Sequence, residues 1–139
     1  MRNILLLLFV LFLFACDDDE KTSVEISYPV EYTLMPSENN SLRPILSYIT
    51  ITDKVNNQDK LGCGGLLVVN SLNGIAAFDL SCPVEWNNAV KMSIDDDLQC
   101  KCNKCGALFD VTNGEGNPIL GTNLSLKKYK ITDGYKITN

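Results

Sequence analysis

Short stretches in which apolar and polar residues alternate recur along this chain, and they constrain its fold more than any other feature. Apolar side chains occupy the even positions of residues 24–34, which predicts a half-buried strand, and Pro29 within it indicates an edge or a bulge. Residues 45–52 alternate again, whereas residues 37–41 are polar and predict a loop. No segment sustains the 3.6-residue periodicity of an amphipathic helix. The pattern predicts an all-β fold, a small sandwich or barrel of short antiparallel strands.

Two hairpins are predicted from their turns. Residues 66–69 form a continuous apolar run typical of a buried strand, and the SLNG sequence that follows turns the chain into a second strand at residues 75–80. Residues 124–132 and 135–138 are expected to pair around Asp133-Gly134, because these residue types suit a tight two-residue hairpin turn.

Residues 1–15 have the form of a secretory signal peptide, with Arg2 ahead of an apolar run at 4–14. In a helix this run rises roughly 17 Å, short of a hydrocarbon core of about 30 Å, so a transmembrane anchor is the poorer interpretation. The sequence Leu13-Phe14-Ala15-Cys16 resembles the lipobox of bacterial lipoproteins, which implies that Cys16 is lipidated and begins the mature chain. The alternative is an ordinary signal peptide followed by a coincidental cysteine.

Residues 16–23 are expected to form an acidic tether, since Asp17-Asp18-Asp19-Glu20 has no apolar content. The acidic run resembles an export signal of some Gram-negative bacteria, which implies a surface-exposed outer-membrane lipoprotein of the cell envelope. Residues 24–139 are then expected to form a single domain. Acidic residues outnumber basic ones by 17 to 12, which disfavours nucleic acid as a partner. The expected partners are the membrane, through the lipid anchor, and an unidentified protein or small molecule.

Five of the six cysteines remain once Cys16 is set aside: Cys63, Cys82, Cys100, Cys102 and Cys105. Two disulfides would leave one cysteine as a free thiol, and a metal site with four thiolates would leave one cysteine unused. The odd number of cysteines therefore does not decide between them. Cys102-Asn103-Lys104-Cys105-Gly106 has the CxxCG form of a metal-binding knuckle, in which two thiolates on a tight turn can face one ion.

Two cysteine loops, Cys82-Pro83-Val84 and Cys102-Asn103-Lys104-Cys105, are separated by residues 85–101. Together with the AFDL that precedes the first loop and the LKKYKITDGYKIT that closes the chain, they make residues 62–139 resemble a Rieske domain. In that family a CxH loop and a CxxH loop hold a two-iron two-sulfur cluster. The resemblance implies a Rieske-like β fold with a two-loop cysteine subdomain at about residues 80–107.

The ligands differ from the family pattern. Val84 has no lone pair and the chain contains no histidine, so a Cys₂His₂ Rieske centre cannot form. A cluster would take Cys82, Cys102 and Cys105, with Cys100, Cys63 or Glu85 as the fourth ligand. Thiolates in place of imidazoles lower the potential of such a cluster, and a signal with one arginine argues against the folded export that clusters require.

Zinc is the expected replacement, because tetrahedral Zn²⁺ accepts thiolates from a CxxC knuckle and a strand-end cysteine. The expected ligands are Cys82, Cys102, Cys105 and Cys100. Cys100 is included because it precedes Cys102 by two residues on a predicted strand and so points to the same face. Glu85 is the alternative fourth ligand, since this chain resembles lipoproteins that have a second CxxC at residues 82–85. A disulfide of Cys82 with Cys102 or Cys105 competes with zinc, and secretion favours it.

The sequence thus predicts a lipid-anchored accessory or binding module with a structural thiolate site, made of zinc or a disulfide. The alternative is an electron-transfer protein that binds a [2Fe-2S] cluster through cysteines. No nucleophile–base pair or phosphate loop is evident, so intrinsic catalysis is the less favoured prediction, and an oxidoreductase role depends on the cluster. A CxxC thiol oxidoreductase would lack the helix that activates its first thiol. Trp86, beside the first loop, is expected to be a packing residue.

Overall fold

The computed structural model describes residues 28–139. The signal peptide at 1–15, the lipidation site Cys16, the tether at 16–23 and the beginning of the first predicted strand at 24–27 lie outside the described residues. No helix within residues 28–139 is long and apolar enough to cross a membrane.

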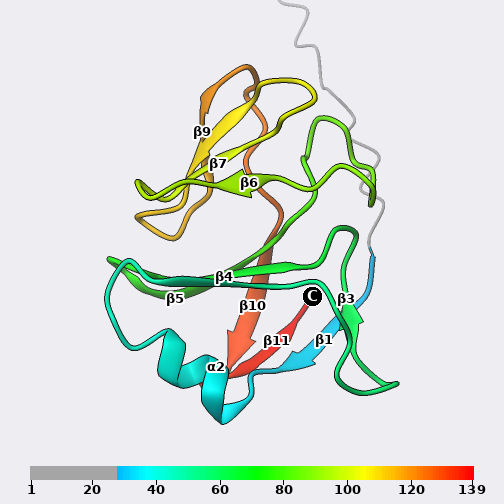
Figure 1. The fold of residues 1–139 in the computed structure, drawn as a ribbon, viewed down its shortest axis with the longest axis vertical. Helices are drawn as coiled ribbons and strands as arrows, with labels where there is room; N and C mark the ends of the chain where they lie inside the picture. The colour runs from blue at the N-terminus through cyan, green and yellow to red at the C-terminus, as the bar shows by residue number, and fades with distance from the viewer. Residues whose placement is uncertain (1–27) are drawn as a thin grey trace, which may run out of the picture.

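The larger of two antiparallel sheets curls into a nearly closed barrel, seen in the lower half of Figure 1. Within residues 28–139 its seven strands follow the order β2-β4-β5-β10-β11-β1-β3. Their bounds are β1 Val30–Thr33, β2 Tyr48–Ile51, β3 Lys60–Leu61, β4 Leu66–Ser71, β5 Gly74–Asp79, β10 Lys128–Thr132 and β11 Lys136–Thr138.

The second sheet is smaller and lies above the barrel in Figure 1. Its strands follow the order β6-β7-β8-β9, with the bounds β6 Ser93–Ile94, β7 Gln99–Lys101, β8 Leu108–Asp110 and β9 Asn117–Leu120. The chain leaves the barrel after β5 and returns at β10, and these two strands are neighbours in the barrel. The small sheet is therefore an insertion between two paired strands.

Strands β4 and β5 are covered on both faces. Leu66 and Val68 pack into the barrel core, while Leu67 and Val69 pack against the small sheet in a second core. Burial on both sides explains why residues 66–69 are a continuous apolar run rather than an alternating one. The two sheets share this wall, so separating them would expose large apolar side chains to water.

The all-β prediction is confirmed, and so are both hairpins. Strand β4 pairs with β5, and β10 pairs with β11 around Asp133 and Gly134, whose φ angles are both positive, at 52° and 74°. The turn is one residue longer than predicted, because Thr132 pairs with Lys136 and three residues, 133–135, lie between them. Strand β1 alternates as expected, with Val30 and Tyr32 buried.

The loop predicted at 37–41 is wrong, because residues Pro36–Ser41 form the short helix α2. Pro36 lies in the first turn, where a missing N–H is not needed. The Glu38 carboxylate accepts hydrogen bonds from the Met35 N–H at 2.7 Å and from the hydroxyl of the buried Tyr32 at 2.8 Å. The second contact ties the helix to the barrel, and local composition could not reveal it.

Candidate metal centre

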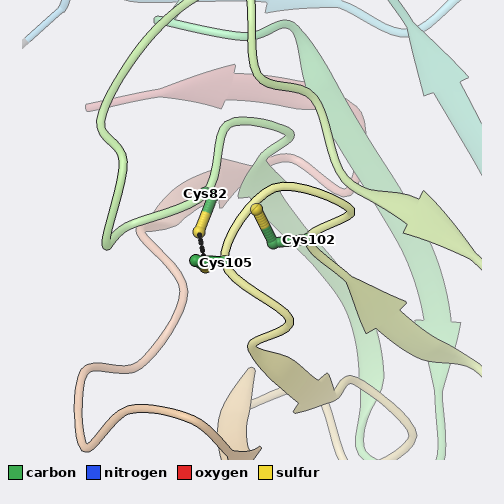
Figure 2. Close-up of side chains that lie close together, drawn as sticks. All are labelled: Cys82, Cys102 and Cys105. Carbon is green, nitrogen blue, oxygen red and sulfur yellow. Dashed lines mark hydrogen bonds between the residues drawn. The ribbon is translucent and has the colours of Figure 1, made fainter.

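Three of the predicted ligands come together where the two cysteine loops meet. The sulfur atoms of Cys82, Cys102 and Cys105 lie within 4.8 Å of one another, and Figure 2 shows them converging from the two loops. The Sγ atoms of Cys82 and Cys105 are 3.6 Å apart. Cys82 and Cys102 are buried, whereas Cys105 lies at the surface. This group can hold a metal ion.

The sulfur spacing suits thiolates around a single ion. In a tetrahedron with metal–sulfur bonds of about 2.3 Å, neighbouring sulfurs are about 3.8 Å apart. The 3.6 Å between Cys82 and Cys105 is close to that edge and far longer than a disulfide bond of about 2.05 Å. All five cysteines of residues 28–139 are free thiols.

The two loops have the same backbone form. The N–H of Trp86 donates to the carbonyl of Cys82 at 2.7 Å, and the N–H of Gly106 donates to the carbonyl of Cys102 at 2.9 Å. Trp86 and Gly106, each four residues after its cysteine, both have positive φ angles, of 41° and 76°. Counted from the first cysteine of each turn, Glu85 holds the place in the first turn that Cys105 holds in the second. The first loop is therefore a cysteine knuckle whose fourth position carries a carboxylate.

The Glu85 side chain already has a partner at this position. Its carboxylate forms an ion pair with Lys104 of the second loop, which bridges the two loops. Hydrogen bonding and charge attraction to Glu85 raise the pKa of Lys104. The Glu85 side chain is only 18% exposed, so this carboxylate is largely shielded from water.

The other two cysteines are placed elsewhere. Cys100, the first choice for a fourth ligand, is fully buried on β7, where it pairs with Phe109 of β8, and it is not part of the sulfur group. Cys63 lies in the turn between β3 and β4 and is also outside that group. Residues two apart on a strand share a face, but Cys102 already belongs to the turn, so the expected alignment with Cys100 is lost.

Backbone donors and burial act in opposite directions on these thiols. Burial raises the pKa of Cys82 to about 12, although the N–H groups of Val84 and Glu85 point toward its sulfur. Burial also opposes ionisation of Cys102, but the N–H groups of Cys105 and Lys104 and the two neighbouring thiols outweigh it and lower the pKa of Cys102. Of the two buried thiols, Cys102 is therefore the one that ionises more readily.

A buried carboxylate that the sequence did not predict fixes the first loop. Asp79, at the end of β5, is 0% exposed and accepts hydrogen bonds from the N–H groups of Cys63, Gly64 and Ser81 and from the Ser81 and Tyr129 hydroxyls. The contacts with Ser81 hold the residue directly before Cys82. The available signal was an aspartate at the end of the apolar stretch 75–80.

Trp86 packs as predicted, but under strain. Its ring lies against Tyr28, with centroids 6.3 Å apart, and its buried indole N–H has no hydrogen-bond partner within residues 28–139. A φ angle of 41° is unfavourable for a residue with a bulky side chain. The second loop avoids this strain by having glycine at the same place.

Comparison of the chain with protein-family models, with curated proteins and with solved structures gives no significant match.

Proposed function

We propose that this chain is a lipid-anchored accessory or binding module of the cell envelope, in which Cys82, Cys102 and Cys105 hold a structural zinc ion that pins the two cysteine loops together. The observation that carries the proposal is the convergence of the three sulfur atoms within 4.8 Å. The anchor is Cys16 and the location is the outer surface of the outer membrane, both inferred from the lipobox and acidic run at the beginning of the sequence.

The sulfur geometry favours one ion over a two-iron cluster. In a [2Fe-2S] cluster each iron takes two protein ligands, so three thiolates would have to be divided between two irons separated by bridging sulfides. Three sulfur atoms that lie close together, with 3.6 Å between those of Cys82 and Cys105, suit thiolates that share one metal ion. The chain also lacks the imidazoles of a Rieske centre, although its two loops resemble that family in spacing.

Glu85 is our choice for the fourth ligand. It occupies, in the first loop, the position that Cys105 occupies in the second, and both turns close with the same hydrogen bond to the carbonyl of their cysteine. Carboxylate oxygen is an accepted zinc ligand at about 2.0–2.2 Å. Lys104 competes for this carboxylate, so binding by Glu85 requires the ion pair to open.

A bound metal ion would stabilise the pairing of the two cysteine loops more than a disulfide would. Structural zinc sites contribute roughly 10–16 kcal/mol of apparent binding free energy, whereas a disulfide closing a loop of this kind contributes about 3 kcal/mol. The first cysteine loop leads from β5 of the barrel to β6 of the small sheet, and the second connects β7 to β8 within the small sheet. A metal here would stabilise the junction between the two sheets.

The test is metal analysis of the full chain, purified in detergent, together with its visible spectrum and free-thiol content. One zinc ion per chain, lost in Cys102→Ser and retained in Cys63→Ser, is the expected result. Cys63 is the matched control because it is a buried thiol outside the sulfur group. Iron with charge-transfer absorption would instead establish the electron-transfer alternative, and loss of free thiols without metal would establish a disulfide.

A further inference from the structure

A cavity of about 440 Å³ opens beside the turn at residues 62–65. One wall is formed by Tyr28 and β3, another by residues Asn88 and Lys91, which follow the first cysteine loop. The volume lies within the range of about 300–1,000 Å³ typical of small-molecule sites.

The charges in this cavity have one sign. Lys54, Lys60 and Lys91 line it, and no aspartate or glutamate does so among residues 28–139. Lys60 has only a loose ion pair with Glu31, at 3.9 Å between half-exposed side chains, while Lys54 and Lys91 have no ion-pair partner in the described part of the chain. The whole chain has a formal net charge of −5, whereas the charged side chains that line this cavity are all positive. Such a concentration of positive charge attracts anions.

The floor of the cavity is rigid. The carboxylate of Asp79 lies beneath it and holds the N–H groups of Cys63 at 2.7 Å and Gly64 at 2.9 Å. A Cβ on Gly64 would lie 2.5 Å from the backbone nitrogen of Ser81, so only glycine fits here. The hydrogen bonds that Asp79 accepts from backbone and hydroxyl donors compensate its own charge. The floor is therefore preformed, which lowers the entropic cost of binding.

We propose that this cavity binds a small soluble molecule carrying at least two negative charges, in phosphate or carboxylate groups. Lys54 and Lys91 supply the free ammonium groups, and Asn88 supplies a neutral hydrogen-bonding group at the wall. The site does not use the sulfur group, so it stands independently of the proposed zinc ion.

The test is calorimetric titration of the full chain in detergent with pyrophosphate and, separately, with citrate, each at constant ionic strength. At least one of them is expected to bind, and the preferred one identifies the charged group. The double variant Lys54→Met/Lys91→Met is expected to lose at least about tenfold in affinity, since each exposed ion pair that is removed accounts for roughly a fivefold change. Lys101→Met, an exposed lysine outside the cavity, is the matched control.

A second readout covers the case in which the double variant is unstable. In wild-type protein, the amide resonances of residues 62–65 and Asn88 are expected to shift on titration. Cys102→Ser is expected to keep anion binding, which separates this site from the metal centre. Absence of binding by both anions, equal affinity in the double variant, or resonance shifts spread over the whole surface would each overturn the proposal.

Discussion

The Tyr129 hydroxyl, on β10, donates a hydrogen bond of 2.6 Å to the Asp79 carboxylate, on β5, inside the barrel. These two strands bracket the inserted small sheet, so the contact closes the base of the insertion. Hydrogen bonds to buried charged groups contribute roughly 1.5–3 kcal/mol.

Tyr129→Phe should therefore lower the free energy of unfolding by about 1.5–3 kcal/mol, because it leaves an Asp79 oxygen with one donor fewer in a buried setting. The measurement is urea denaturation. Tyr135→Phe, at a tyrosine 45% exposed, is the control and should change stability by less than about 0.5 kcal/mol. Equal effects of the two substitutions would contradict the assigned role of the Asp79–Tyr129 contact.

Stability should decline at alkaline pH. Burial and the neighbouring carboxylates of Asp79 and Glu38 raise the pKa of Tyr129 and of Tyr32 above the ordinary value of 10.0. Above pH 10 the unfolded chain releases these protons while the folded chain keeps them, so the unfolding free energy falls as pH rises, by about 1.4 kcal/mol per pH unit for each tyrosine. Denaturation measured between pH 9 and 11 tests this, and Tyr129→Phe should show a shallower decline. A flat profile would contradict the prediction.

Metal-free protein should show a clear order of thiol reactivity at neutral pH. Cys105 should react first with iodoacetamide because it is exposed, whereas Cys100 should resist, since burial and the charges of Asp95 and Asp110 raise its pKa to about 12. Mass spectrometry after brief labelling reads the order, with unfolded protein as the control in which both react. Bound zinc should protect Cys105 and leave the slow rate of Cys100 unchanged. Rapid labelling of Cys100 in the folded protein would refute its placement in the core.

Glu85→Cys should convert the first loop into a full CxxC knuckle and raise zinc affinity by at least about tenfold, because a fourth thiolate replaces a carboxylate that Lys104 holds. Competition with a chromogenic chelator measures the affinity. Glu85→Ala should weaken binding, while Cys100→Ala should leave it unchanged at some cost in stability, since Cys100 lies in the core. An unchanged affinity in Glu85→Ala would remove Glu85 from the ligand set.

Much of the fold follows from local pattern. The apolar run at 66–69, the alternation in β1 and the Asp133-Gly134 turn each predict a strand or hairpin that the structure contains. These features could be read because side-chain periodicity and turn geometry are set by neighbouring residues. Helix α2 could not, because part of what fixes its Glu38 is a hydroxyl from the barrel, on Tyr32.

The candidate site was only partly predictable. The spacing of Cys102 and Cys105 indicates a knuckle, and a strand-end Cys82 indicates a second contributor, since both signals are local. Local spacing could not show which residue is the preferred fourth ligand. Sequence proximity favoured Cys100, yet the chain turns at Cys102 and leaves Cys100 behind in the core. The sequence already offered Glu85 as the alternative, and the matching hydrogen bonds and positive φ angles of the two turns add a structural reason for it.

By itself, the sequence determined that the chain is all-β, that it cannot ligate through histidine, and that Cys82, Cys102 and Cys105 lie in two loops, because composition, local periodicity and spacing carry that information. The tertiary structure decided which thiols meet, which carboxylate clamps the loop before Cys82, and that three lysines face one cavity. Those relationships join residues far apart in the chain, and they depend on how two sheets pack across the shared wall of β4 and β5. Packing of that kind is set by side-chain shape and burial in three dimensions, which no local pattern encodes.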